Sequence, residues 1–213
     1  MKTKDKIISN AIKLFNTQGV SNVRLQDIAK ESNISAGNLN YHYHLKRDLI
    51  IAVLAYMSQS FRDMKVNNVK RLEQGDYTAV IKSFLNFQIK HRFFYRDILE
   101  ISRFTDDAAA LFEYQMNEVL NFTRTGMQLA VEKGLIQPEP HEGHYTYFAK
   151  SLWAILSSWL VEREILGNHK VNIDKVMTAI WECHYPYLTD VGQELYLTMK
   201  NELTDMIESD AML

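Results

Sequence analysis

Residues 25–42 read LQDIAKESNISAGNLNYH and contain two short amphipathic segments separated by three residues. The apolar spacing predicts a helix over residues 25–32 and a second helix, six or seven residues long, that begins at Ala36. Ser35 is a favourable N-cap for the second helix. Because so short a helix is not stable alone, neighbouring helices must hold it. Two short helices joined in this way are typical of a helix-turn-helix, although a generic helical corner has the same pattern.

The exposed side of the second predicted helix carries small, amide-bearing and hydroxyl-bearing residues. These are Ala36, Gly37, Asn38, Asn40 and Tyr41. Small residues allow a close approach of the backbone, and Asn can pair with adenine edges in the major groove. A surface selected only for solubility usually carries Lys and Glu, whereas no charged residue occurs between Glu31 and Lys46. The pattern therefore favours a helix that enters the major groove of DNA.

Helices are expected along the rest of the chain because turn-forming residues are few. The 213 residues include 8 glycines and 3 prolines, and half of the glycines stand where predicted helices end. The other expected helices span residues 4–18, 46–74, 77–91, 93–103, 106–133, 142–167, 173–185 and 189–208. The sequence thus predicts an all-α fold of about nine or ten helices.

Composition and charge narrow the classes of function. A composition of 46% hydrophobic and 23% charged residues excludes a mainly disordered chain. The single cysteine cannot form an intramolecular disulfide, and the longest apolar run, residues 49–57, is shorter than the ~20 residues that span a bilayer. We therefore expect a cytoplasmic protein without a membrane partner.

Charge is unevenly distributed along the chain. Residues 1–50 contain eight Lys and Arg against four Asp and Glu, whereas the remainder contains sixteen against twenty-two. A basic N-terminal part is consistent with a polyanionic partner, although chance alone can produce an excess of this size.

A set of spaced motifs occurs throughout the first 50 residues. They are Ala11-Ile12-Lys13-Leu14-Phe15, Gly19-Val20, Asp27-Ile28-Ala29, Ile34-Ser35, Gly37-Asn38-Leu39, Tyr41-His42-Tyr43 and Lys46-Arg47-Asp48-Leu49. Together they resemble the DNA-binding domain of the TetR (tetracycline repressor) family of transcriptional regulators. The resemblance implies a three-helix, helix-turn-helix DNA-binding domain in residues 1–46 and a larger helical ligand-binding and dimerisation domain in residues 47–213.

The chain departs from the family pattern at three places in this domain. Asn40 replaces an aromatic residue, Ser32-Asn33 replaces Ala-Gly in the turn, and Arg24 replaces a small hydroxyl residue at the start of the second helix. Asn tolerates the left-handed backbone conformation that a turn can need, so we expect the fold to be kept. The base contacts of other members, however, cannot be transferred to this chain.

The resemblance also implies which residues contact DNA. They are Arg24, Ser35, Gly37, Asn38, Asn40, Tyr41, His42 and Lys46. Those of the recognition helix would face base edges or the sugar–phosphate backbone, whereas His42, Lys46 and Arg24 are expected to clamp phosphates. For His42, a capping or packing role is the alternative. Phosphate contacts fix the register, and groove-facing side chains read the sequence.

For the C-terminal part, the resemblance implies a homodimer that binds a near-palindromic operator. Apolar stripes on two expected helices suggest an intermolecular bundle, although such stripes are also typical of a core. The candidate dimer residues are Phe148, Leu152, Ile155, Trp159, Trp181 and Tyr196.

The resemblance further implies a small-molecule effector that lowers DNA affinity, with repression as the family default. Aromatic residues suggest an apolar or amphipathic ligand. The candidate effector contacts are Phe87, Phe104, Tyr114, Phe122 and Trp153. The Arg96-Asp97 pair, beside the aromatic residues 93–95, either orients a polar head group or belongs to a solvated helix start.

Three other classes of function fit the sequence less well. An enzyme is disfavoured because HEGH at residues 141–144 is one residue short of the zinc-protease motif, and Gly-rich phosphate loops and nucleophile elbows do not occur. A metal- or redox-sensing regulator would use histidines or Cys183, whereas a lone cysteine is usually a small core residue. The third alternative is a helical small-molecule-binding protein with weak or absent DNA binding. We expect neither catalysis nor a cofactor or metal.

Overall fold

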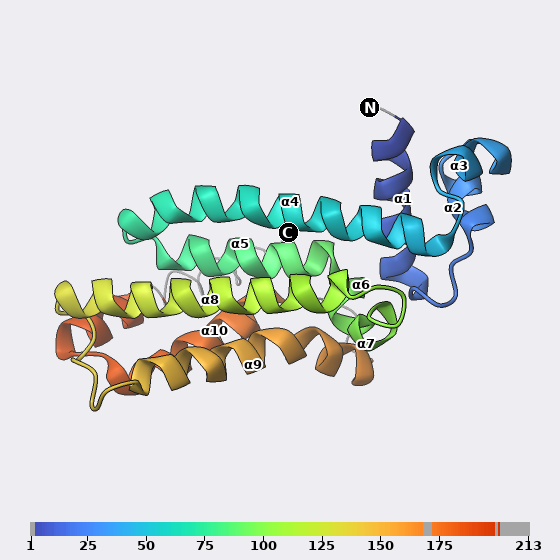
Figure 1. Cartoon of the computed structure of the whole chain (residues 1–213). Coiled ribbons are helices and arrows are strands. Elements are labelled where there is room, and N and C mark those ends of the chain that lie inside the picture. The colour runs from blue at the N-terminus through green and yellow to red at the C-terminus, as the bar shows by residue number, and fades with distance from the viewer. Residues whose placement is uncertain (1–2, 168–171, 199, 201–213) are drawn as a thin grey trace. The chain divides into compact units, whose positions relative to one another are not determined.

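The computed structural model describes residues 3–167, 172–198 and 200, and most of them are helical (Figure 1). The helices are α1 (Thr3–Gln18), α2 (Leu25–Glu31), α3 (Ala36–His42), α4 (Lys46–Glu73), α5 (Tyr77–Lys90), α6 (Arg92–Arg96), α7 (Ile98–Ile101), α8 (Asp107–Glu132), α9 (His144–Ile165), α10 (Ile173–His184) and the 3-10 helix η1 (Tyr185–Tyr187). Residues 190–198 are also helical, and these described residues contain no β-strand beyond one isolated bridge between Ile136 and Leu188. The predicted all-α fold is therefore confirmed. None of the described helices is long and apolar enough to cross a membrane.

Most helices begin and end within two residues of the predicted positions. The single helix predicted over residues 93–103 is wrong, because two short helices, α6 and α7, are separated at Asp97. The backbone of Asp97 (φ −105°, ψ 17°) leaves the helical region where its carboxylate binds a distant backbone N–H. Residues 199 and 201–208 of the last predicted helix lie outside the described residues.

The chain divides into two compact units. The first comprises Met1–Met116 with Leu160–Glu162, and the second comprises Asn117–Trp159 with Arg163–Leu213. The functional division between residues 1–46 and 47–213 stays a prediction.

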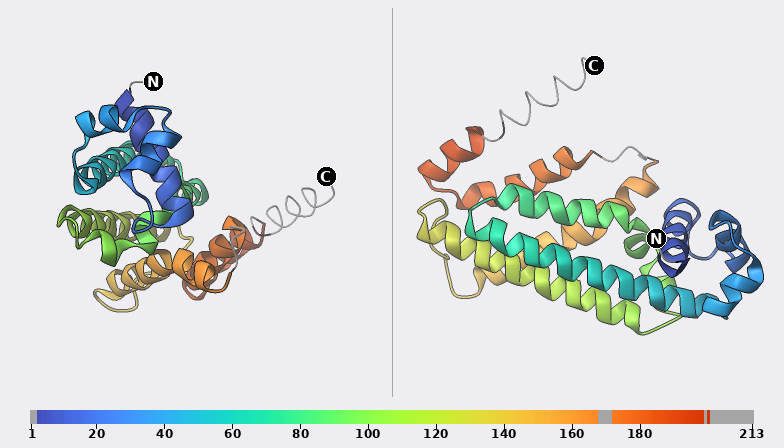
Figure 2. Two further views of the ribbon diagram at one scale, coloured as in Figure 1. Left: turned by 90° about the vertical axis from the view of Figure 1, so that its right-hand side faces the viewer. Right: turned by 90° about the horizontal axis from the view of Figure 1, so that it is seen from above.

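The first unit is organised around α4. At one end of α4, α1 packs against α2 and α4, and α3 packs on α2; farther along, α5 lies beside α4 (Figure 1 and Figure 2). The core of the helix-turn-helix is formed by apolar residues that are almost fully buried, namely Ile7, Phe15, Ile28, Leu39 and Leu49. Because α4 is one continuous helix of 28 residues, it joins the helix-turn-helix directly to α5.

In the second unit, the loop after α8 is tied to the segment after η1. The Gln137 N–H donates to the Tyr187 carbonyl (2.8 Å), and the Thr189 N–H donates to the Leu135 carbonyl (3.0 Å). A Cβ atom on Gly192 would lie 2.1 Å from the Leu135 carbonyl oxygen, so this position requires glycine. The backbone contact therefore fixes the start of the helical residues 190–198.

Candidate nucleic-acid interface

The short helix α3 is held by one cap and one apolar anchor. The Ser35 Oγ atom accepts a hydrogen bond from the Asn38 backbone N–H (3.1 Å), which confirms Ser35 as the N-cap. Leu39 of α3 points into the core and is almost fully buried, and Ile34 is half-buried in the preceding turn. These contacts replace the stability that a seven-residue helix lacks on its own.

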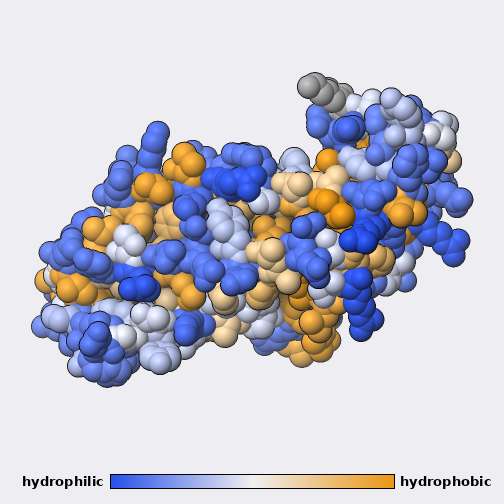
Figure 3. Space-filling view, in the orientation of Figure 1, coloured by the Kyte–Doolittle hydropathy of each residue, from blue (hydrophilic) through white to orange (hydrophobic). Residues whose placement is uncertain are grey.

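The outer face of α3 is polar and exposed. The side chains of Asn38, Asn40 and Tyr41 are all exposed, Tyr41 to 80%. A Cβ atom on Gly37 would meet nothing closer than the Ser35 Oγ atom at 3.9 Å, so packing within the chain does not require glycine there. A glycine that its own chain does not need is consistent with a partner that approaches the backbone closely. The part of the helix-turn-helix that is visible in Figure 3 is mostly hydrophilic.

The turn before α3 adopts the conformation that the sequence suggested. Asn33 has φ 52°, in the left-handed region, and the preceding Ser32 is fully buried. The Asn10 side-chain amide of α1 donates to the Ser32 Oγ atom (3.1 Å). The Ser32-Asn33 departure therefore keeps the turn geometry and adds a side-chain contact to α1.

Two of the expected phosphate clamps lie near α3 and α2. His42 is half-buried, and its ring centroid lies 5.3 Å from that of Tyr41 and 6.5 Å from that of Tyr43. The exposed Arg24 is the N-cap residue of α2, and its backbone N–H donates to the Asp27 carboxylate (2.8 Å). The Arg24 guanidinium therefore remains on the surface at the start of α2.

Lys46 is placed differently from the other expected clamps. Its ammonium donates to the backbone carbonyls of Val20 and Ser21, the latter at 3.2 Å, and lies 6.0 Å from the centre of the Phe104 ring. Burial lowers the pKa of Lys46. Its ammonium thus holds the loop between α1 and α2, and a phosphate contact by Lys46 stays a prediction.

The end of α1 is bound to α6 by a set of contacts that we call the α1–α6 junction. Its residues are Phe15, Asn16, Val20, Lys90, Arg92, Phe93, Arg96 and Asp97.

Asn16 makes four hydrogen bonds across the α1–α6 junction, one of them between its carbonyl and the Arg96 Nη1 atom (3.3 Å). Its amide donates to the Lys90 carbonyl (2.9 Å), its side-chain oxygen accepts from the Phe93 N–H (3.0 Å), and its carbonyl accepts from the Arg92 Nε atom (3.1 Å). The Phe15 and Phe93 rings pack beside these bonds, with centroids 5.6 Å apart. A side chain on α1 thereby caps both ends of the α5–α6 corner.

Arg96 and Asp97 complete the α1–α6 junction as an ion pair (2.7 Å). The Arg96 guanidinium donates to the Phe15 carbonyl (2.7 Å), and the Asp97 carboxylate accepts from the Val20 N–H (2.9 Å). The expectation of a solvated helix start is therefore wrong, since the pair is largely buried, and a ligand head-group contact stays a prediction. Sequence reasoning missed the junction because its partners are 74 to 81 residues apart.

The candidate effector residues are distributed over both units. In the first unit, Phe87 and Tyr114 both pack against Phe61, with ring centroids 5.4 and 5.6 Å away. Phe104 lies instead beside the Lys46 ammonium, as described above. Phe122 and Trp153 belong to the second unit, where Trp153 is buried.

The candidate dimer residues lie in the second unit. Phe148, Leu152, Trp159 and Tyr196 are buried within a single chain. The other two, Ile155 and Trp181, are half-buried. A role for any of the six in a dimer stays a prediction.

The described side chains give no support to the alternative of a metal- or redox-sensing regulator. Within residues 3–167, 172–198 and 200, no group of three or more His, Cys, Asp or Glu side chains could hold a metal ion. Cys183 is half-buried on α10.

Comparison with known families gives two adjacent matches. Residues 7–53 match a family described as "Bacterial regulatory proteins, tetR family", and residues 55–196 match the TetR family described as "Bacterial transcriptional repressor". Together they span most of the chain, and the proteins that they describe are transcriptional regulators.

One relative aligns with a short part of the chain, and another aligns with most of it. The chain is 48% identical over 46 residues to the biofilm operon icaADBC negative transcriptional regulator IcaR of Staphylococcus epidermidis, which is 22% of this chain and only 25% of that protein. It is 26% identical over 155 residues to the probable HTH-type transcriptional regulator YttP of Bacillus subtilis, covering 66% of this chain and 72% of that protein.

Solved structures share the fold. A TetR-family transcriptional regulator from Marinobacter aquaeolei VT8 has a TM-score of 0.80 at 24% identity, covering 95% of this chain and 98% of that chain. The structure of AibR in complex with isovaleryl coenzyme A and operator DNA has a TM-score of 0.62 at 15% identity, covering 88% of this chain and 100% of that chain.

Proposed function

Because the chain belongs to the TetR family of bacterial transcriptional regulators, we propose that it binds a near-palindromic DNA operator as a homodimer and that a small-molecule effector releases it. The observation that carries the DNA-binding part is the outer face of α3. That face combines exposed amide and hydroxyl groups with a glycine that the fold does not require, on a helix fixed by Ser35 and Leu39. In this proposal Asn38, Asn40 and Tyr41 face base edges in the major groove.

The small size of the reading surface supports a homodimer. One α3 helix reads few base pairs, whereas two copies read half-sites ~34–36 Å apart or a multiple of that spacing. The second unit has exposed apolar side chains that suit such an interface, namely Tyr147, Ile165, Leu166, Val191, Leu195 and Leu197. In this proposal the buried residues Phe148, Leu152 and Trp159 support the interface from within the chain.

The relatives support an effector and repression. AibR was solved with isovaleryl coenzyme A as well as operator DNA, and IcaR is named a negative regulator. In this chain the α1–α6 junction gives an effector a route to the DNA-binding end of the first unit. An effector can shift DNA affinity only by binding the released form more tightly than the DNA-bound form.

The first test is a selection of random duplex DNA on the purified protein, followed by a salt titration on the selected sequence. We expect a near-palindromic sequence bound by a dimer, with affinity that falls steeply as salt rises. A folded protein that selects no sequence even at low salt would contradict the proposal and favour a ligand-binding protein without DNA binding.

Variants of α3 test which surface reads the operator. Tyr41→Ala and Asn38→Ala should each weaken binding to the selected operator by about tenfold or more while leaving the dimer intact. Leu99→Ala is the matched control, because Leu99 is also 80% exposed but lies on α7. Wild-type operator affinity in both α3 variants would show that another surface reads the DNA.

A further inference from the structure

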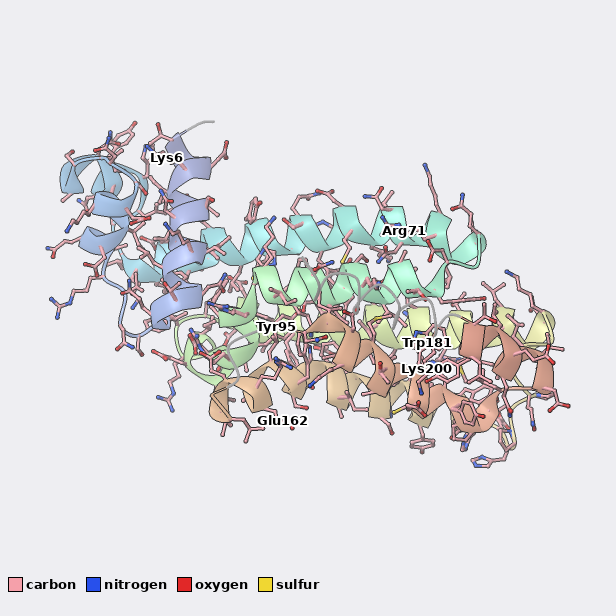
Figure 4. The ribbon with its side chains drawn as sticks, turned by 180° about the vertical axis from the view of Figure 1, so that it is seen from behind. Lys6, Arg71, Tyr95, Glu162, Trp181 and Lys200 are labelled. Atoms are coloured by element: carbon pink, nitrogen blue, oxygen red, sulfur yellow. The ribbon has the colours of Figure 1, made fainter. Side chains whose placement is uncertain are left out.

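The interior of the first unit contains four buried polar side chains, Gln88, His91, Tyr95 and Gln115, which we call the buried polar cluster; Tyr95 contacts both glutamines, and His91 packs against Phe87. Gln88, His91 and Gln115 are fully buried, and Tyr95 is almost fully buried. They come from α5, the residue between α5 and α6, α6 and α8. Figure 4 labels Tyr95 among the side chains of the ribbon. Polar groups in such a place normally satisfy one another, because an unpaired buried donor or acceptor costs about 1–3 kcal/mol.

His91 presents a bare hydrogen-bond acceptor to the interior. Its Nδ1 atom lies 3.0 Å from the Phe87 carbonyl oxygen. Since a carbonyl only accepts, Nδ1 carries the proton and Nε2 carries the lone pair. Burial lowers the pKa of His91 to about 4, so the ring is neutral at pH 7. The Nε2 atom has no hydrogen-bond partner among the residues that the structure describes.

Gln115 presents the opposite kind of group. The Tyr95 hydroxyl donates to the Gln115 Oε1 atom (2.7 Å), which leaves the amide nitrogen on the other side. Within the described part of the chain, this Nε2 atom has no acceptor. The buried polar cluster therefore contains one unpaired acceptor and one unpaired donor, and both are fully buried.

The side chains that pack against the His91 ring are aromatic, and the positive charge of the exposed Lys90 also acts on this ring. Phe87 packs against the His91 ring (4.5 Å between centroids) and also against Phe61, which contacts Tyr114 next to Gln115. The buried residues of the described structure include no Lys, Arg, Asp or Glu. A cation placed here would lose its hydration and be repelled by Lys90, and an anion would lose its hydration with only the exposed Lys90 ammonium as a counter-charge.

A partly exposed aromatic side chain, Tyr56, lies beside His91. The His91 ring lies 6.4 Å from that of Tyr56, a side chain that is 40% exposed. The Lys90 ammonium lies over the Tyr56 ring, 5.6 Å from its centre.

We propose that His91 and Gln115 are the polar anchors of the effector site, and that the effector is an uncharged amphipathic molecule with a hydroxyl or carboxamide end. This end would donate to the His91 Nε2 atom and accept from the Gln115 amide, while an apolar body lies against Phe61, Phe87 and Tyr114. The inference rests on the effector-responsive function proposed above. It also explains coupling, because His91 directly precedes Arg92 of the α1–α6 junction.

Phenol, benzoate and toluene are suitable probes because they share one ring but differ in polarity and charge. Each is titrated into the full chain labelled with 15N-histidine, in the absence of DNA. We expect phenol to bind and to move the His91 Nε2 resonance toward lower frequency, as hydrogen bonding to a lone pair does. Toluene should bind more weakly, and benzoate most weakly. Equal or tighter binding of benzoate, or no change at His91 with phenol, would overturn the proposal.

Two variants and one control assign the effect to the anchors. His91→Phe and Gln115→Leu should each weaken phenol binding by about tenfold. His184→Phe is the matched control, because the His184 Nδ1 atom makes the same bond to the carbonyl four residues earlier (2.7 Å) in the second unit. Phenol affinity unchanged in both anchor variants, with folding verified by circular dichroism, would also overturn the proposal.

The outcome of the phenol titration can be distinguished from the outcome of the DNA selection. If the protein selects an operator but phenol does not reach His91, only the site assignment fails. If phenol binds at His91 but no DNA is selected, the proposed regulation fails and the ligand site stands.

Discussion

The outer face of α3 and the buried polar cluster both contain polar groups that the chain itself does not use, but they lie in opposite environments. On α3, Asn38, Asn40 and Tyr41 face water, which satisfies them without cost. In the buried polar cluster, the unpaired atoms of His91 and Gln115 face the protein interior, where each costs about 1–3 kcal/mol.

The difference determines how strongly each region points to a partner. An exposed polar side chain is ordinary, so α3 is informative only through its pattern of small and amide-bearing residues next to a turn in which Asn33 is left-handed. A buried unpaired group is rare, so His91 and Gln115 are informative one by one. The two regions therefore need different tests, one of affinity and one of stability.

The largest expected effect is the pH dependence that His91 imposes on stability. Its folded pKa of about 4 lies below the ordinary value of 6.5, so the unfolded chain binds more protons between these values. The contribution of His91 to the free energy of unfolding should therefore be complete above pH 6.5. It should fall by about 1.4 kcal/mol per pH unit below that, so that about 3 kcal/mol is lost near pH 4.

The measurement is urea unfolding of wild type and His91→Phe from pH 7.5 to pH 4. The variant should lose this share of the pH dependence, and its stability at pH 7.5 should change little. The Phe87 carbonyl remains paired, since it also accepts from the His91 backbone N–H in wild type (3.1 Å). Identical pH profiles would show that His91 is hydrated in the folded chain and would break the contrast with α3.

The next effect concerns polar groups that the chain does use, at the α1–α6 junction. Asp97→Ala removes the ion-pair partner of Arg96, which keeps its bonds to backbone carbonyls, and the acceptor of the Val20 N–H. We expect a loss of about 2 kcal/mol in the free energy of unfolding, because both remaining groups are largely buried. Urea unfolding at pH 7.5 measures this loss.

An exposed ion pair supplies the control for the α1–α6 junction. Lys13 and Glu31 lie 2.6 Å apart, with side chains that are 66% and 36% exposed. Glu31→Ala should change stability by no more than about 0.5 kcal/mol, since exposed pairs contribute little. Equal losses in Asp97→Ala and Glu31→Ala would mean that the junction is no more than a surface contact.

The sequence predicted the local features of this molecule and missed those that depend on distant contacts. The Ser35 cap and most of the helix limits follow from neighbouring residues, and they were confirmed within the described residues. The break at Asp97 was missed because its cause is the Val20 N–H, 77 residues away. His91, between Lys90 and Arg92, has the pattern of a surface residue, and only the packing of α5 and α6 shows that it is buried.

The smallest effect tests the turn that presents α3. Asn33 has φ 52°, where a β-branched residue costs about 1–2 kcal/mol and glycine costs almost nothing. Asn33→Val should therefore lower the free energy of unfolding by about 1 kcal/mol and also weaken operator binding, because α3 is positioned by this turn. Asn33→Gly should retain both properties. If Asn33→Val lowers stability but binds the selected operator like wild type, the position of α3 does not control reading, and the outer face of α3 loses its assigned role.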